Sequence, residues 1–117
     1  MTDSLLTVTV VRAQPGVTLE LTGELDLSSV PILEGALEGI DPGVEQVTLD
    51  LAGLTFLDSS GLNVFANTRV ALRSEGCELV LRAPRPTVLR TLTVAGLADV
   101  FDLADEVATE DAATTVD

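Results

Sequence analysis

The chain has 117 residues, with 6 basic and 19 acidic side chains and a formal net charge of −13 at pH 7. A chain of this length buries roughly 65% of its unfolded surface on folding, which is enough for one domain with its own core. Hydrophobic residues make up 46% of the sequence, so we expect a globular protein and not a disordered acidic chain.

Several residue types on which enzymes depend are missing. The sequence has no His, Lys, Trp or Tyr, which removes the commonest general base, a His metal ligand and the lysines of Schiff bases and P-loops. We therefore expect a protein that is not an enzyme and that uses no cofactor or metal. The strong negative charge also disfavours nucleic acid and anionic membranes as partners.

No segment of the sequence resembles a membrane span or a leader. The longest uncharged stretch, Ser59–Thr68, is too short to span a bilayer, and the first four residues lack the basic start of a signal peptide. We expect a cytoplasmic protein. The lone Cys77 cannot form an intramolecular disulfide and is expected to be a small core residue.

Two runs rich in β-branched residues come first in the chain. Leu5–Val11 and Val17–Thr22 are separated by Gln14-Pro15-Gly16, a combination typical of a β-hairpin. We expect these runs to be antiparallel edge strands.

A helix is predicted next. Ser28 and Ser29 are N-cap candidates, Pro31 suits a first turn, and the helix should end near Gly39. Its periodic apolar positions are Ile32, Leu33, Ala36, Leu37 and Ile40.

The rest of the chain alternates strands with helices. We expect first a strand Val47–Leu51, a turn at Ala52-Gly53 and an apolar segment Leu54–Asp58. A helix Ser60–Glu75, capped by Gly76, and a strand Cys77–Arg82 should follow. The last predicted helix starts at Ala83-Pro84-Arg85-Pro86, runs through Ala95 and ends at Gly96. The remainder, Leu97–Asp117, reads as a short apolar segment with one helical turn and then a frayed tail.

This order predicts a single α/β domain. Its sheet is mixed, with an N-terminal antiparallel hairpin and a parallel centre with right-handed crossovers, packed with α-helices. We assign residues 1–104 to the domain and residues 105–117 to an acidic C-terminal tail that is a last helical turn or disordered. From Asp99 onward the chain has seven acidic residues and no basic one. Such a tail is either simply solvated or binds a partner.

The segment with most chemical content is Leu57-Asp58-Ser59-Ser60-Gly61-Leu62, where a strand passes into a helix. Ser59 and Ser60 can act as helix caps, because a hydroxyl at this place accepts a bond from a free backbone N–H. A phosphate on Ser59 would instead meet free N–H groups and the positive end of the helix dipole. Catalysis by Ser59 lacks a suitable base, since only Asp58 could serve.

The helix after Ser59 has two faces at 100° per residue. One arc is predicted to be core, and the opposite arc is predicted to face a partner. The core arc comprises Val64, Phe65, Thr68, Ala71 and Leu72, and the partner arc comprises Leu62, Ala66, Arg69 and Arg73.

Three acidic residues come from separate loops near this helix. Glu24, Asp26 and Asp58 offer oxygen ligands that a hard cation could use, but they lack the ligand spacing of a cation cage. We expect them to form a negative surface for a partner and not a metal site.

Taken together, these segments resemble the STAS domain of bacterial anti-sigma factor antagonists. The resemblance rests on Gly23-Glu24-Leu25-Asp26 before a helix, Leu57-Asp58-Ser59-Ser60-Gly61-Leu62 at a strand end, Arg82-Ala83-Pro84, and Val94-Ala95-Gly96-Leu97 with Phe101. It covers the chain from about Leu5 to Leu103. Asn63 departs from the family, because many members have glycine there.

The resemblance implies a partner switch. In the family, the serine directly after the motif aspartate is phosphorylated by an anti-sigma factor that is a Ser/Thr kinase, which carries over to Ser59. The unmodified form binds that kinase and frees a sigma factor, and a phosphatase restores it. The implied partner-binding residues are Glu24, Asp26, Asp58, Ser60, Gly61, Leu62, Ala66 and Arg69.

Two other functions remain open at this point. The chain could be a STAS subunit of a transporter or signalling assembly, in which Ser59 only caps its helix. It could also be an acyl carrier protein, a class of small acidic proteins modified at an Asp-Ser pair before a helix. The β-rich segments argue against a carrier, because carriers are helical throughout.

Overall fold

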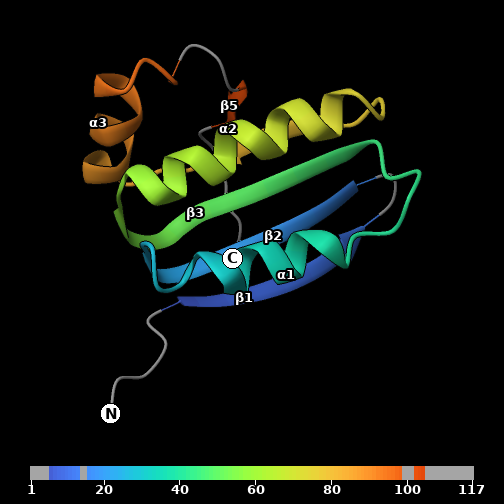
Figure 1. Cartoon of the computed structure of the whole chain (residues 1–117), viewed down its shortest axis with the longest axis horizontal. Coiled ribbons are helices and arrows are strands. Elements are labelled where there is room, and N and C mark those ends of the chain that lie inside the picture. The colour runs from blue at the N-terminus through green and yellow to red at the C-terminus, as the bar shows by residue number, and fades with distance from the viewer. Residues whose placement is uncertain (1–5, 14–15, 99–101, 105–117) are drawn as a thin grey trace, which may run out of the picture.

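The computed structural model describes residues 6–13, 16–98 and 102–104. In chain order its elements are β1 (Leu6–Ala13), β2 (Gly16–Leu25), α1 (Val30–Glu38), β3 (Gln46–Leu57), α2 (Ser59–Arg73), β4 (Glu78–Arg82), α3 (Pro86–Val94) and β5 (Asp102–Ala104) (Figure 1). The predicted α/β class and order of elements are confirmed.

The strands form one five-stranded mixed sheet in the order β1-β2-β3-β4-β5. β1 pairs antiparallel with β2 along its whole length, and β2, β3, β4 and β5 are mutually parallel. The predicted hairpin and parallel centre are therefore confirmed. The prediction that both hairpin strands are edges is wrong for β2, which lies between β1 and β3.

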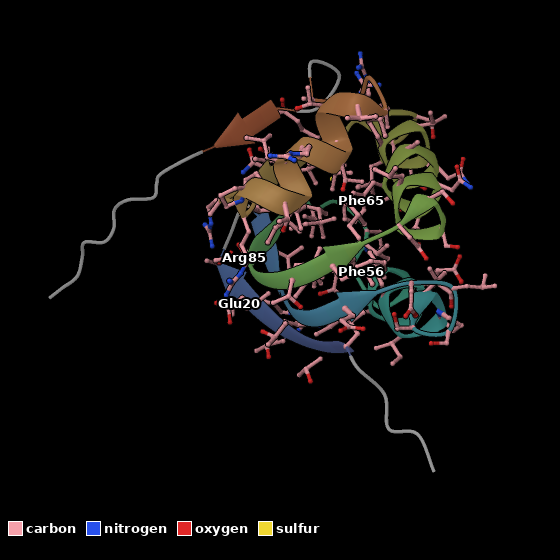
Figure 2. All side chains as sticks on the ribbon, turned by 90° about the vertical axis from the view of Figure 1, so that its left-hand side faces the viewer. Glu20, Phe56, Phe65 and Arg85 are labelled. Carbon is pink, nitrogen blue, oxygen red and sulfur yellow. The ribbon has the colours of Figure 1, made fainter. Side chains whose placement is uncertain are left out.

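The core lies between the sheet and the helices α1 and α2, which lie side by side on one face (Figures 1 and 2). α1 covers β1, α2 packs against β4, and α3 packs against β3. Alternating side chains of the central strands point into this core, because successive residues of a strand face opposite sides. The fully buried ones include Leu19, Leu21, Leu49, Leu51 and Leu81.

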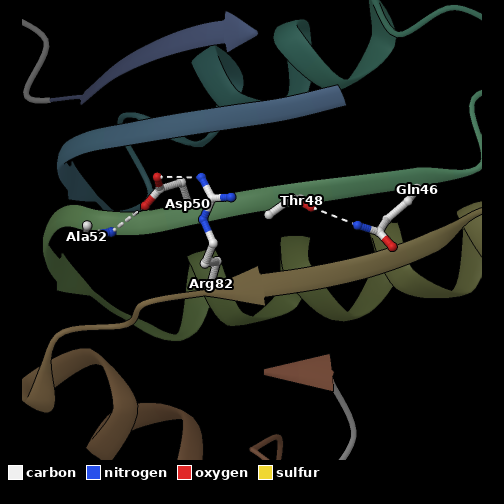
Figure 3. Close-up of polar contacts among 5 residues, drawn as sticks. All are labelled: Gln46, Thr48, Asp50, Ala52 and Arg82. Atoms are coloured by element: carbon white, nitrogen blue, oxygen red, sulfur yellow. Dashed lines mark hydrogen bonds and ion pairs between the residues drawn. The ribbon is translucent and has the colours of Figure 1, made fainter. Parts of the chain in front are cut away.

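The opposite face of the central strands is polar (Figure 3). Arg82 of β4 forms an ion pair with Asp50 of β3 at 2.8 Å, and Gln46 donates to the Thr48 hydroxyl at 3.2 Å. The Arg82 side chain is 38% exposed, so this ion pair contributes at most about 1 kcal/mol. The ion pair joins register partners of β3 and β4.

β3 is one continuous strand of 12 residues, so the predicted turn at Ala52-Gly53 is wrong. Gly53 instead lies where the register between β2 and β3 shifts. A Cβ atom on Gly53 would lie 2.8 Å from the Thr22 Oγ1 atom, which explains the glycine without a turn.

Three further expectations change in detail. Ile32, one of the periodic apolar positions of the predicted helix, is 37% exposed, because the buried stripe of α1 centres on Leu33. Residues 102–104 form a strand and not a helical turn, since they pair with β4. Cys77 is buried as predicted, and burial raises the pKa of its thiol.

The tail from residue 105 onward lies outside the described residues, so its predicted state stays a prediction. Among the helices of the described part, none is long and apolar enough to cross a membrane.

Candidate functional site

The ends of β2 and β3 bring two strand-to-helix junctions together. Leu25 and Leu57 are register partners at these ends, and the Asp58 N–H donates to the Leu25 carbonyl at 3.3 Å. We call residues 24–29 and 56–61 the carboxyl edge. Figure 2 looks toward this edge, with Phe56 labelled near its centre.

Asp58 is the N-cap of α2. Its Oδ1 atom accepts hydrogen bonds from the Ser60 N–H at 2.9 Å and from the Gly61 N–H at 3.3 Å. The expectation that Ser59 or Ser60 provides the cap is therefore wrong. A carboxylate here also lies at the positive end of the helix dipole, which stabilises its charge.

Ser59 is the first residue of α2, and it is exposed. Within the part of the chain that the structure describes, its hydroxyl has no hydrogen-bond partner. The neighbouring Ser60 is only half-exposed. Of these two adjacent hydroxyls, that of Ser59 is the more accessible to another protein.

The backbone around Ser59 is less open than the sequence suggested. Asp58 already occupies the N–H groups of Ser60 and Gly61, and the Leu62 N–H donates to the Asp58 carbonyl at 3.0 Å. A phosphate on Ser59 would meet the helix dipole but would compete with the Asp58 carboxylate for these donors. The expected free N–H groups are therefore largely taken.

Gly61 lets α2 begin close to the sheet. A Cβ atom on this buried glycine would lie 2.5 Å from Leu57 Cδ1 and 2.8 Å from Leu25 Cδ2. Both leucines are themselves buried, so neither can easily swing aside. The glycine in this motif thus has a packing role.

Asp26 organises the first junction in the same way. Its Oδ1 atom accepts bonds from the Ser28 hydroxyl at 2.8 Å, the Ser28 N–H at 3.1 Å and the Ser29 N–H at 3.2 Å. The Ser28 hydroxyl is the main reason why the pKa of Asp26 lies below its usual value; bonds from Ser29 act in the same direction, against partial desolvation. Asp26 thus carries a negative charge near neutral pH.

Ser29 ties this junction to the sheet. It is 2% exposed, donates its hydroxyl proton to the Glu24 carbonyl at 2.9 Å and accepts from the Asp26 N–H at 3.0 Å. A buried hydroxyl bonded on both sides is a structural group and is closed to modification.

Of the predicted partner-binding residues, Glu24, Asp26, Asp58, Ser60 and Gly61 all lie at the carboxyl edge. Leu62, Ala66 and Arg69 continue along α2, where each is half-buried. Leu62 also packs against the core, so its side chain is shared between core and surface.

The predicted core arc of α2 is correct in its main members. Val64 and Phe65 are buried, and Leu72 packs against the core from a half-buried position. Ala71 is exposed, so its assignment to the core is wrong. Among the described residues, no group of three or more His, Cys, Asp or Glu side chains is placed to hold a metal ion.

Two exposed apolar side chains were missed by sequence reasoning. Leu27 is 75% exposed and Phe56 is 47% exposed, both at the carboxyl edge. Leu27 stands between two polar residues, directly before the predicted N-cap serines, which is a weak signal of exposure. Phe56 lies in an apolar run, so its sequence context indicated burial.

Comparison with known proteins identifies a family whose members resemble this chain. The family model described as "Mlab, STAS domain" matches residues 8–105. The anti-sigma-B factor antagonist of Listeria monocytogenes is 31% identical over 85 residues, covering 71% of this chain and 74% of that protein. The antagonist of the same name from Bacillus subtilis is 25% identical over 99 residues, covering 85% of this chain and 91% of that protein.

Solved structures agree with the sequence relatives. An anti-sigma factor antagonist from Mycobacterium paratuberculosis is 28% identical, with a TM-score of 0.75 over 84% of each chain. The unphosphorylated anti-sigma factor antagonist SpoIIAA is 24% identical, with a TM-score of 0.70 over 86% of this chain and 90% of that one, and shares the fold.

Proposed function

We propose, since this chain belongs to the STAS domain family, that it is an anti-sigma factor antagonist controlled at Ser59. In its unphosphorylated form it binds an anti-sigma factor Ser/Thr kinase and thereby releases a sigma factor. Phosphorylation of Ser59 switches it off, and a phosphatase restores it. The chain thus acts in the cytoplasm as a binding protein and kinase substrate, without catalysis of its own.

The observation that carries this proposal is the exposed hydroxyl of Ser59, which directly follows the capping Asp58. A kinase needs a hydroxyl that it can reach without unfolding its substrate. The relatives named anti-sigma-B factor antagonist support the choice of partner class.

The switch would act mainly through charge at the interface. A phosphate adds about −1.5 to −2 charges beside Asp58 and across from Asp26. At an effective dielectric near 20, one added charge about 5 Å from a partner carboxylate costs on the order of 3 kcal/mol before screening, or about a hundredfold in affinity. The helix dipole partly offsets the local cost within this chain, so the fold itself need not change.

Asp58 gives the switch a second local effect. The phosphate and the Asp58 carboxylate would share the donors of Ser60 and Gly61, which stand 2.9 and 3.3 Å from the carboxylate in the unmodified chain. Two anions at one helix start repel each other, so we expect the Asp58 side chain to move while the helix stays.

The assembly-subunit function remains the second candidate. It shares this fold and would leave Ser59 unmodified. An acyl carrier protein is excluded, because carriers are helical and this chain folds around a five-stranded sheet.

The experiment is a binding titration with each anti-sigma factor Ser/Thr kinase encoded in the same genome, purified singly. Unmodified wild-type chain should bind one of them, and Ser59→Asp should bind that kinase about a hundredfold more weakly with an unchanged circular dichroism spectrum. Ser74→Asp, which adds the same charge at an exposed serine at the far end of α2, is the matched control and should bind as the wild-type chain does. Failure of every kinase to bind the wild-type chain would contradict the proposal.

A further inference from the structure

Two exposed apolar side chains lie at the carboxyl edge, in the same two segments that carry Asp26 and Ser59. Phe56 directly precedes Leu57, and Leu27 follows two residues after Leu25, the register partner of Leu57. Along the backbone, Phe56 and Leu27 therefore lie within about 7 Å of the paired residues Leu57 and Leu25. Leu27 is 75% exposed and Phe56 is 47% exposed.

The position of Leu27 corresponds to that of Ser59. Asp26 and Asp58 each follow a buried leucine, and each caps the N–H groups two and three residues later. The residue directly after the aspartate is Leu27 in one junction and Ser59 in the other, and both point out of the fold. The sheet thus presents a leucine beside the candidate phosphoacceptor.

The loop that carries Leu27 is held in place. Ser28 and Ser29 bond to the Asp26 carboxylate on one side of it, and Ser29 bonds to the Glu24 carbonyl on the other. Leu27 is therefore preorganised in its exposed position, which lowers the entropy that binding costs.

The rim of this apolar pair is acidic. Glu24 is the register partner of Phe56, and their side chains share one face of the sheet. Asp26 and Asp58 flank Leu27 and Ser59, and the whole chain has a net charge of −13. Charge complementarity therefore favours a cationic partner surface.

We propose that Leu27 and Phe56 anchor a docking surface, rimmed by Glu24, Asp26 and Asp58, for a protein that offers an apolar pocket bordered by arginine or lysine. This rests on the proposed function, because the protein that docks here is the one that reaches Ser59. A phosphate on Ser59 would bring its hydration shell beside Leu27 and prevent the dry contact that apolar anchors require.

The first test titrates the kinase that binds the wild-type chain against Leu27→Ala and Phe56→Ala. Val10→Ala and Val11→Ala are matched controls, because these side chains are 37% and 42% exposed on β1 and pair with Leu19 and Thr18 near the start of β2, away from the carboxyl edge. We expect each edge variant to lose about tenfold or more in affinity and the controls to lose less than about twofold. Raising the salt concentration should weaken wild-type binding. Equal affinity of all four variants would overturn the docking surface while leaving the phospho-switch intact.

A second test does not depend on the kinase. A short amphipathic peptide of leucine and arginine is titrated into the labelled chain and followed by NMR, beside the same peptide with glutamate in place of arginine. The arginine peptide should shift the Leu27 methyl and Phe56 ring signals, and the glutamate peptide should not. Shifts centred elsewhere, or concentration-dependent dimers that Phe56→Ala abolishes, would contradict the proposal, the latter because the occupant would be a second copy.

Discussion

In both strand-to-helix junctions of the carboxyl edge an aspartate accepts hydrogen bonds from the N–H groups two and three residues later, but the residues that follow it serve opposite purposes. After β2, Asp26 is followed by an exposed leucine and then by two serines whose hydroxyls are hydrogen-bonded. After β3, Asp58 is followed by an exposed serine whose hydroxyl has no partner among the described residues. The serine hydroxyls of the first junction therefore have structural roles, whereas the Ser59 hydroxyl of the second junction is available for modification.

The third residue after each aspartate differs as well. It is the buried Ser29 in the first junction and the buried Gly61 in the second. The first site has room and polar partners for a side chain, whereas the second is closed by Leu25 and Leu57. An aspartate followed closely by two serines at a strand end therefore does not by itself identify a phosphoacceptor, whereas the burial and hydrogen bonding of each hydroxyl do.

The largest expected effect on stability comes from Ser29→Ala. It leaves the half-buried Glu24 carbonyl and Asp26 N–H without their partner, which should cost about 1 to 3 kcal/mol in the free energy of unfolding. Ser59→Ala is the matched control and should change it by less than about 0.5 kcal/mol. Urea denaturation of both variants measures the difference. Similar losses of stability would contradict the claim that the Ser29 hydroxyl is structural and the Ser59 hydroxyl is not.

Gly61→Ala should destabilise the fold by about 1 to 2 kcal/mol. The new methyl group would overlap Leu57 and Leu25, and this overpacking outweighs the better helix propensity of alanine. Gly35→Ala in α1 is the control, because nothing lies within 4 Å of its Cβ position, and it should stabilise by about 0.5 to 1 kcal/mol. Thermal unfolding of both variants measures these two effects. A stabilised Gly61→Ala chain would show that Leu57 and Leu25 can move to accommodate the added methyl group.

Asp58→Ala removes the cap of α2 and should cost about 1 kcal/mol. Asp58→Asn keeps an oxygen acceptor for the Ser60 N–H and should recover most of that loss. Amide hydrogen exchange in the first turn of α2 is the local readout. Unchanged exchange in Asp58→Ala would mean that water replaces the cap without cost.

The smallest effect concerns pH. Because the folded state lowers the pKa of Asp26 below the usual 3.8, its ionised form stabilises the fold fully above that pH. This contribution is lost as the pH falls through the lower folded-state pKa. Ser28→Ala removes the main cause, so NMR titration of the Asp26 carboxyl carbon should show a higher pKa in that variant. An unchanged value would assign the shift to the backbone donors.

The sequence predicts the layout of the sheet well and its local exceptions poorly. β-Branched runs and the Pro-Gly turn predict the hairpin, because these signals are local. Gly53 was misread as a turn, since the same glycine serves a register shift that depends on Thr22 across the sheet. β5 was missed for a similar reason: three residues form a strand only because β4 is there to pair with.

The candidate site shows the same limit. The Asp58-Ser59 pattern and its place at a strand end are readable from the sequence, whereas the identity of the cap is a matter of geometry. The exposure of Leu27 and Phe56 depends on where neighbouring elements stop, which no local pattern encodes. Periodicity likewise misplaced Ala71, because this residue lies at the margin of the predicted arc, whereas Leu72 one residue later still packs against the core.

The most direct test of the central claim is to map the phosphate after the partner kinase and ATP have acted on the wild-type chain. Peptide fragmentation by mass spectrometry should place a single phosphate on Ser59 and none on Ser28, Ser29 or Ser60, and Ser59→Ala should abolish the added mass while Ser60→Ala keeps it. Phosphate on Ser28, or transfer that survives Ser59→Ala and disappears in Ser60→Ala, would contradict the account.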